Sequence, residues 1–307
     1  MLFAPPPVID TEVFARLPDA LRTARPDNPW VMGQPLGAPV GSFLEGPSFD
    51  RHGHLWCVDI QNGRILRVDP EGCFHVVAEY DGWPNGLKIH RDGRVFVTDY
   101  KHGIMQVDPA SGRVSPVLGR HTVEPFKGVN DLFFAADGTM YFTDQGLTGL
   151  HDPTGRLFRL RPDGRLDCLL DNIPSPNGLV MNRDETALYL AVTRGNCIWR
   201  VPFLRNGDLA KVGVFIQLSG GGGPDGLALD EAGGLVIAHV ALGTVWIFDA
   251  HGEPACRVKS CAGIMTTNIA FGGPDGRTLH ITESASGCIL RARVPTAGKP
   301  MYSHAAG

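Results

Sequence analysis

A pattern of about 45 residues recurs six times along the chain and constrains the fold more than any other feature of the sequence. The six copies are LEGPSFDRHGHLWCVD, PNGLKIHRDGRVFVTD, VNDLFFAADGTMYFTD, PNGLVMNRDETALYLAV, PDGLALDEAGGLVIAH and TNIAFGGPDGRTLHITE. One polar residue occupies an equivalent place in each copy: Glu45, Asn85, Asn130, Asn177, Asp225 and Asn268. Successive members are separated by 40, 45, 47, 48 and 43 positions. A period of this length is typical of a repeat architecture.

Each copy has the pattern of two β-strands joined by a tight turn. Residues 95–97 and 141–142 are β-branched or aromatic, and the turn at 91–93 contains Asp-Gly. A further pair of strands follows in most copies, for example at 63–69 and 74–77. Four antiparallel strands per copy form a blade, so the sequence predicts an all-β, six-bladed β-propeller. The alternative is a two-sheet sandwich with degenerate repeats, which the blade-length period disfavours.

The blades are expected to form one domain over residues 41–295. Residues 1–40 form an N-terminal extension, in which residues 8–14 are expected to supply the outer strand that closes the last blade. Residues 296–307 are expected to be a C-terminal tail. The chain has 39 Gly and 24 Pro among 307 residues, which favours many turns and few long helices.

Charge and composition exclude several classes of function. The net charge is −4 and basic residues form no tract, which disfavours binding to nucleic acid. No apolar run approaches the roughly 18 residues needed to span a bilayer, and the proline-broken start lacks the basic region of a signal peptide. The seven scattered cysteines favour reduced thiols over a disulfide framework. We therefore expect a cytoplasmic protein without nucleic-acid or membrane partners, whose oligomeric state the sequence does not specify.

The six equivalent polar residues are expected to meet in space. The first strand of each propeller blade lines the central channel, so equivalent positions face one another across it. The set holds two carboxylates and four amides, and two carboxylates repel each other unless a cation lies between them. Oxygen donors of this kind suit a hard divalent ion, Ca²⁺ before Mg²⁺. The competing interpretation is that Asn-Gly and Asp-Gly simply start strands, as ordinary turn dipeptides do.

Four short motifs give the chain a resemblance to a known family. They are LEGP at 44–47, GVND at 128–131, SPNGL at 175–179 and PDGL at 224–227. In this order they resemble the SMP-30/gluconolactonase family over about residues 40–295. The resemblance implies a six-bladed propeller with one divalent metal at the channel mouth, held by Glu45, Asn177 and Asp225. It also implies that Asn130 contacts the metal or the substrate, and that Asp225 serves as a general base.

One position departs from the pattern of the sugar-lactonase members. They carry an Arg two residues before the Asn of the GVND-type motif, where it contacts the substrate, and this chain has Gly128 there. Gluconolactone is therefore not implied as the substrate. An Arg introduced at this position is expected to shift the preference towards hydroxylated sugar lactones.

The chemistry of the set predicts a metal-dependent hydrolase that opens a small, sugar-derived or similar lactone. The ion, most simply Ca²⁺ with Mg²⁺, Mn²⁺ or Zn²⁺ as alternatives, would polarise the carbonyl while a carboxylate activates water. Asp225 is the first candidate base, with Asp131 and Asp144 as alternatives. Strand alternation, however, predicts that Asp131 packs between blades if Asn130 faces the channel. The alternative functions are a phosphotriesterase of the diisopropyl-fluorophosphatase type and a non-catalytic calcium-binding propeller.

Further side chains are predicted to surround the substrate. The second strand of each blade returns to the metal end of the channel, so residues just beyond it are expected to border the pocket. His239 replaces the Asp that ends this strand in three other copies, and an imidazole there could donate to the substrate. The predicted substrate-binding residues are Asn85, Asn130, Asn268, His239, Trp83 and Gln145. Other expected rim residues are Tyr100, Lys101, His102, Arg194 and Ser284.

Overall fold

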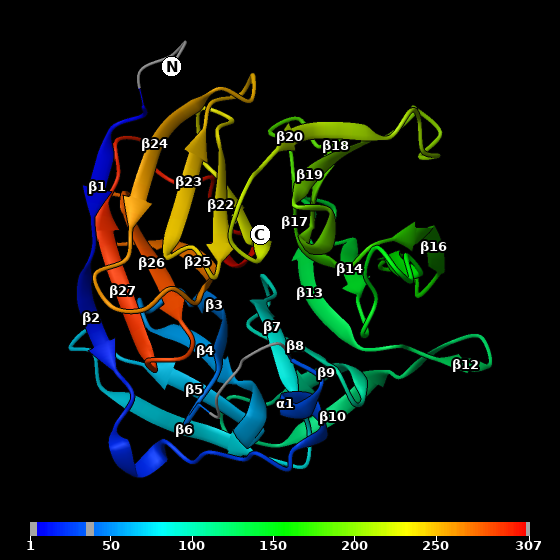
Figure 1. Cartoon of the computed structure of the whole chain (residues 1–307). Coiled ribbons are helices and arrows are strands. Elements are labelled where there is room, and N and C mark those ends of the chain that lie inside the picture. The colour runs from blue at the N-terminus through cyan, green and yellow to red at the C-terminus, as the bar shows by residue number, and fades with distance from the viewer. Residues whose placement is uncertain (1–4, 35–39, 305–307) are drawn as a thin grey trace.

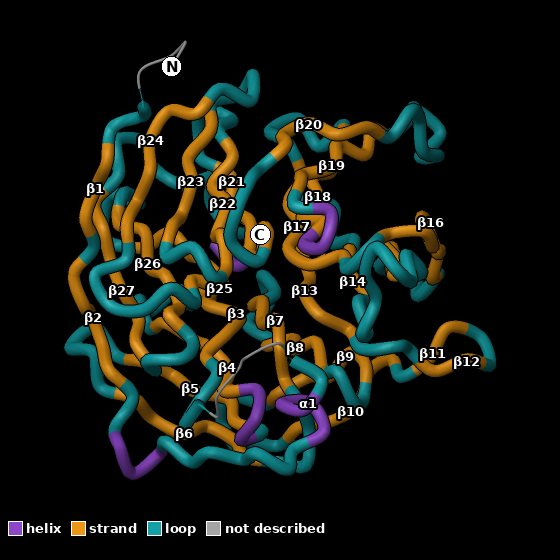
Figure 2. Tube along the Cα trace, viewed as in Figure 1, coloured by secondary structure: helices purple, strands orange, loops and turns teal. Residues whose placement is uncertain are grey.

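Six β-sheets stand around a common axis as the blades of a propeller (Figure 1). The structure is a computed structural model that describes residues 5–34 and 40–304. Residues 1–4 and 35–39 of the predicted extension, and 305–307 of the predicted tail, lie outside the described residues. Helices are confined to short segments between strands (Figure 2). The predicted all-β, six-bladed architecture is confirmed.

The first three blades follow the chain from the axis outwards. Blade 1 contains β3 (Leu44–Phe49), β4 (Leu55–Asp59), β5 (Arg64–Val68) and β6 (Phe74–Glu79). Blade 2 contains β7 (Pro84–Ile89), β8 (Val95–Asp99), β9 (Gly103–Val107) and β10 (Val114–Leu118). Blade 3 contains β13 (Val129–Phe134), β14 (Met140–Asp144), β15 (Gly155–Leu160) and β16 (Leu166–Ile173). Between blades 2 and 3 lies a hairpin of β11 (Arg120–His121) and β12 (Glu124–Pro125).

The remaining blades complete the ring. Blade 4 contains β17 (Pro176–Met181), β18 (Ala187–Val192), β19 (Cys197–Pro202) and β20 (Gly213–Gln217). Blade 5 contains β21 (Gly223–Leu229), β22 (Leu235–Val240), β23 (Thr244–Phe248), β24 (Pro254–Lys259) and β1 (Val8–Asp10). Blade 6 contains β25 (Thr266–Gly272), β26 (Thr278–Glu283), β27 (Cys288–Arg293) and β2 (Glu12–Arg16). The short helices are η1 (Asp19–Leu21), α1 (Pro29–Met32), η2 (Ile60–Asn62), η3 (Thr193–Gly195) and η4 (Tyr302–His304).

The hydrophobic core lies between blades and is built by strand alternation. Every residue of β18 is buried, because blades 3 and 5 cover both faces of this strand. Leu190 belongs to the cluster that contains Tyr141 of blade 3, whereas Tyr189 belongs to the cluster that contains Ile237 of blade 5. Neighbours in the sequence thus point to opposite sides, and a continuous apolar run is required where both faces are packed.

The N-terminal segment closes the ring. Strand β2 pairs antiparallel with β27, with Val13 opposite Leu290, and becomes the outer strand of blade 6. Strand β1 instead pairs parallel with β24 of blade 5. The expected closing strand at 8–14 is therefore two strands in two blades. They are separated at Thr11, whose Oγ1 donates to the Lys259 carbonyl over 3.0 Å.

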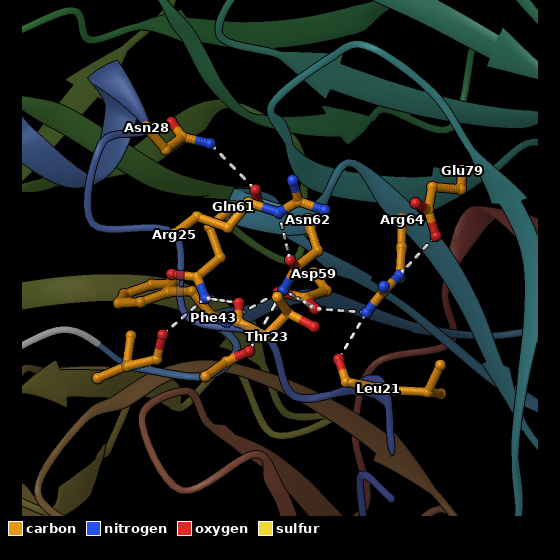
Figure 3. A network of polar contacts seen from close by, with 12 residues as sticks. Leu21, Thr23, Arg25, Asn28, Phe43, Asp59, Gln61, Asn62, Arg64 and Glu79 are labelled. Carbon is orange, nitrogen blue, oxygen red and sulfur yellow. Dashed lines mark hydrogen bonds and ion pairs between the residues drawn. The ribbon is translucent and has the colours of Figure 1, made fainter. Parts of the chain in front are cut away.

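A polar network fixes residues 21–34 and 40–43 against blade 1 (Figure 3). The Arg25 Nε donates to Asn62 Oδ1 over 2.9 Å, and Asn28 Nδ2 donates to the Gln61 carbonyl over 3.0 Å. Asp59 Oδ1 accepts from the Phe43 amide over 2.9 Å. These bonds hold α1 and Phe43 at the end of the channel where the inner strands begin.

The described part of the C-terminal tail lies at the opposite end of the channel. Tyr302 stacks on Phe134, with ring centroids 5.4 Å apart, and Ser303 Oγ donates to the Phe49 carbonyl over 3.4 Å. Both partners are the last residues of inner strands, β13 and β3. All seven cysteines are unpaired. Among the described residues, no helix has the length and hydropathy that crossing a bilayer requires.

Candidate active site

The innermost strand of each blade carries one of the six equivalent polar residues near its start. The inner strands β3, β7, β13, β17, β21 and β25 contact one another in this order around the axis (Figure 1). Their polar residues are at most 9% exposed: Glu45, Asn85, Asn130, Asn177, Asp225 and Asn268. The structure therefore brings residues that lie up to 223 positions apart in the sequence to one end of the channel, as the repeat predicts.

Glycine follows four of these residues because the inner strands approach one another closely. A Cβ on Gly46 would lie 2.6 Å from the Asn85 carbonyl oxygen of the next strand. A Cβ on Gly178 would overlap the backbone oxygen of Asp225 in the same way. Backbone cannot move aside for a methyl group, so Gly is required at these positions. The Asn-Gly and Asp-Gly pairs lie within strands at the axis, and their glycines serve close approach between blades.

A β-bulge interrupts every inner strand beside its polar residue. In blade 3 the pairing with β14 shifts between Val129 and Leu132, and each other blade has a shift at the equivalent place. A bulge breaks the alternation of side chains. Asp131 is consequently 3% exposed with its Oδ2 3.5 Å from Asn268 Nδ2 of the opposite blade. The expectation that Asp131 packs between blades is wrong: its side chain reaches the channel axis.

Threonines of the second strands hold the bulges in place. The Thr98 hydroxyl accepts from the Gly86 amide over 2.7 Å and donates to the Asn130 carbonyl of the next blade. Thr143 likewise accepts from the Asp131 amide over 3.1 Å and donates to the Asn177 carbonyl over 2.9 Å. The Thr-Asp pairs at 98–99 and 143–144 were the sequence signal for this arrangement.

Three buried carboxylates converge on the axis. Burial raises the pKa of Glu45 from 4.5 to about 7, with a further contribution from the charge of Asp131. Burial also raises the pKa of Asp225 well above its usual range, followed by the charges of Glu45 and Asp131. Each negative charge makes it less favourable to ionise the other carboxyl groups, so the cluster is stabilised either by protonation or by a bound cation. A divalent ion therefore fits this donor set.

Amide groups supply the rest of the polar surface. Glu45 Oε2 accepts from Asn268 Nδ2 over 2.8 Å and from the Gly46 amide over 2.6 Å. Asn130 Nδ2 donates to Gln145 Oε1 over 2.9 Å. The side-chain oxygen of Asn130 therefore points away from Gln145. No three His, Cys, Asp or Glu side chains of the described residues are grouped closely enough to hold a metal. A metal here would depend on asparagine oxygens together with Glu45 and Asp225.

The converging residues line a cavity of about 130 Å³ at the channel mouth. All four predicted metal ligands border it: Glu45, Asn130, Asn177 and Asp225. Asn85 and Gln145, predicted to contact the substrate, border it as well, together with Tyr100 and Arg194. The cavity has a polar floor and is open to the surface on one side.

Other predicted contact residues lie elsewhere. Asn268 is 2% exposed and lies beneath Glu45, outside the cavity wall. Trp83 borders a separate surface groove on blades 1 and 2. His239 is fully buried: its Nε2 donates to the Gly220 carbonyl over 3.0 Å, and its Nδ1 accepts from Trp246 Nε1 over 3.2 Å. Burial lowers the pKa of His239, and both of its ring nitrogens already have partners within the fold.

The remaining rim and base candidates are also engaged away from the cavity. Lys101 pairs with Asp81 at 2.6 Å on the surface. The ring of His102 contacts the Asp81 backbone over 2.6 Å, and the Ser284 hydroxyl is fully buried. Asp144 accepts from the Gly128 amide over 2.8 Å and from Arg156 Nε over 2.8 Å. Asp144 therefore fixes the loop before Asn130 and is not available as a base.

Sequence reasoning missed the wall that the N-terminal extension contributes. Trp30 of α1 and Phe43 meet edge to face, with ring centroids 5.0 Å apart, and both border the cavity. Met265 also borders the cavity and packs against the cluster that contains Trp30 and Phe43. No repeat pattern covers Trp30, so only its position in the fold reveals the role.

The space beside Gly128 is occupied by Tyr100. Gly128 has φ +152°, and a Cβ there would lie 2.5 Å from the Tyr100 ring. The Tyr100 hydroxyl donates to Gln145 Oε1 and lies 2.8 Å from the Gly146 carbonyl. An Arg at position 128, expected to shift the preference towards hydroxylated sugar lactones, would therefore have to displace Tyr100 and strain the backbone.

Comparison with known proteins identifies the family. The profile of the SMP-30/Gluconolactonase/LRE-like region matches residues 43–285. The chain belongs to this family. A gluconolactonase of Zymomonas mobilis is 34% identical over 232 residues, which cover 70% of this chain and 64% of that protein. The chain thus matches just under two thirds of the length of this family relative.

Solved structures of the family share the fold. A gluconolactonase from Xanthomonas campestris superimposes with a TM-score of 0.73 at 25% identity, covering 95% of this chain and 98% of that one. A calcium-binding protein, regucalcin, from Agrobacterium tumefaciens gives a TM-score of 0.77 at 22% identity, covering 96% and 99%. Each superposition extends over nearly the whole chain.

Proposed function

We propose that this protein is a metal-dependent lactonase that hydrolyses a small lactone at the channel mouth. The observation that carries the proposal is the convergence of Glu45, Asn130, Asn177 and Asp225 on one cavity. Membership of the SMP-30/gluconolactonase family and the gluconolactonase of Zymomonas mobilis support the choice of reaction.

Glu45, Asn130, Asn177 and Asp225 would hold the cation. The two carboxylates balance a charge of two, and oxygen donors with variable spacing suit Ca²⁺ better than Mg²⁺, which demands a stricter octahedron. Mn²⁺ and Zn²⁺ remain alternatives for the test below. A divalent cation bound there supplies a Lewis acid that polarises the lactone carbonyl.

The chain's own groups supply the remaining chemistry. Asp225 is 9% exposed at the cavity wall, where its carboxylate can accept a proton from an attacking water. Asn177 donates a hydrogen bond to Asp225 and fixes its carboxylate. Gln145 Oε1 accepts a hydrogen bond from Asn130 Nδ2, so the side-chain oxygen of Asn130 faces away from Gln145. Trp30 and Phe43 form an apolar side wall that excludes water from the lactone ring.

Hydrolysis of a panel of γ- and δ-lactones, with a phosphotriester in the same panel, tests the proposal. We expect lactone turnover that exhaustive chelation abolishes and added Ca²⁺, Mn²⁺ or Zn²⁺ restores. Full activity after chelation would show that the reaction does not need a cation. Turnover of the phosphotriester alone would replace the lactonase by a phosphotriesterase, and cation binding without any turnover would leave a calcium-binding propeller.

A matched pair of variants tests the role of Asp225. Asp225→Asn keeps the shape but removes one of the two balancing charges and the base, so we expect activity to fall about 100-fold or more and cation affinity to fall with it. Asp171→Asn changes an exposed Asp outside the cavity and serves as the control. Equal activity in the two variants would contradict the assignment.

A further inference from the structure

A second hollow continues outward from the metal cavity. It has a volume of about 490 Å³ and shares Gln34, Tyr100, Gln145 and Arg194 with the inner cavity. Its outer wall is the loop that follows β14, including Leu147 and His151. None of the described residues that line this outer hollow is Asp or Glu, whereas Arg194 and His151 are basic. Arg194 therefore carries the one permanent positive charge among the described residues that line the outer hollow.

Arg194 stands where the two hollows meet. It belongs to η3, which joins β18 to β19 in blade 4, and its side chain is exposed. Burial raises the pKa of Tyr100 and of Asp225, and the positive charge of Arg194 opposes this rise slightly in both cases, so the guanidinium lies within electrostatic reach of the site.

The guanidinium has little to hold it within the described part of the chain. Its Nη1 donates one long hydrogen bond, 3.5 Å, to the Gly222 carbonyl, and no described carboxylate lies within ion-pairing distance. Other arginines near the blades are paired: Arg156 with Asp144, and Arg159 with Asp167 at 2.9 Å. An Arg presents a planar fork of donors that matches a carboxylate in a bidentate pair.

We propose that Arg194 binds a carboxylate on the substrate, so that the enzyme's substrates are lactones bearing an anionic carboxylate group. This inference rests on the proposed lactonase function and names its substrate class. The lactone ring occupies the inner cavity above Asp225, and the carboxylate extends to the junction with the outer hollow. A single guanidinium fork suits a carboxylate, whereas a phosphate dianion usually recruits more donors.

Two lactones that differ only in charge test the proposal. They are γ-butyrolactone and 5-oxotetrahydrofuran-2-carboxylate, assayed with the wild type, Arg194→Gln, Arg194→Lys and the control Arg205→Gln. Arg205 is an exposed arginine in the turn between β19 and β20 and lines neither hollow. Its variant removes the same net charge, so it controls for the overall field of the protein.

We expect the wild type to prefer the carboxylated lactone in kcat/KM by about tenfold or more, chiefly through KM. Arg194→Gln should reduce this ratio about tenfold, Arg194→Lys should retain part of it, and Arg205→Gln should retain it fully. A wild-type ratio near one, or equal ratios in Arg194→Gln and Arg205→Gln, would overturn the proposal while leaving the lactonase function intact.

A binding measurement separates the two proposals. Tetrahydrofuran-2-carboxylate has the carboxylate but no lactone carbonyl, so calorimetric titration of the chelator-treated protein reports anion binding without turnover. Affinity about tenfold weaker in Arg194→Gln than in Arg205→Gln supports the role of Arg194 even if neither lactone is hydrolysed. Equal affinity in the two variants refutes it.

Discussion

Replacing Glu45 with Gln is expected to stabilise the metal-free protein at pH 8. Glu45 is 3% exposed, and burial with the nearby charge of Asp131 raises its pKa from 4.5 to about 7. At about 1.4 kcal/mol per pKa unit, ionising this side chain in the folded protein costs about 3 kcal/mol of the free energy of unfolding. Gln keeps an oxygen for the Gly46 amide and Asn268 Nδ2, so the variant loses the cost without losing these bonds.

The effect has a defined pH window. A carboxyl group with a raised folded-state pKa costs nothing below its unfolded pKa of 4.5, because it is protonated in both states. The cost grows as the pH rises towards 7, where the folded-state group ionises, and is constant above that. The advantage of Glu45→Gln should therefore be small at pH 5 and complete at pH 8.

Urea unfolding with a chelator present, at pH 5 and pH 8, measures the effect. The control is Glu253→Gln, an exposed glutamate in the turn between β23 and β24, which should match the wild type at both pH values. Added Ca²⁺ should reverse the order at pH 8, because the wild type binds the ion with a charge that the variant lacks. If Glu45→Gln is no more stable than the wild type at pH 8 without metal, the reasoning from the buried carboxylates is wrong.

Three further outcomes follow from the same geometry. Calorimetry should show Ca²⁺ affinity rising with pH from pH 5 upwards, by up to about tenfold per pH unit for each proton displaced, since protons on Glu45 and Asp225 compete with the ion; a flat profile would contradict this. Gly178→Ala should lower the free energy of unfolding by about 3 kcal/mol, because the added Cβ meets the Asp225 backbone. Gly213 has open space around it, so the control Gly213→Ala should change the free energy of unfolding little. Equal values for the two variants in urea unfolding would refute the close approach of the strands. Gly128→Arg should lower the melting temperature and gain no sugar-lactone activity, because Tyr100 fills the space; an unchanged melting temperature would show that the ring yields.

Much of the architecture follows from the repeat. The period predicts six blades, and the position of one polar residue in each predicts where Glu45 and Asp225 meet, although 180 positions separate them in sequence. This inference depends only on equivalent strands facing one axis. The same reasoning fails where the backbone departs from ideal pleating: the bulge beside Asn130 turns Asp131 towards the axis, and alternation alone cannot foresee it.

The surroundings of the site are harder to predict because they come from outside the repeat or from contacts distant in sequence. Trp30 reaches the cavity only because the network around Asp59 holds the N-terminal segment against blade 1. His239 stands where other repeats have Asp, which suggests a functional role from the sequence alone. In the structure both of its ring nitrogens are hydrogen-bonded, one to Trp246 and one to the Gly220 carbonyl. Such pairings depend on loop conformations that no periodic signal encodes.

The pairing of β2 with β27 has a consequence for biosynthesis. Glu12 lies opposite Arg291, 279 positions later, so β2 must wait for the synthesis of β27 before blade 6 can form. Contacts between such distant parts of a chain slow folding, since the intervening polypeptide must already be ordered. A nascent chain halted before β27 would hold five blades and an unpaired edge, exposed to aggregation and to chaperones. The synthesis of β27 thus sets the earliest moment at which the channel, and with it the site, can be complete.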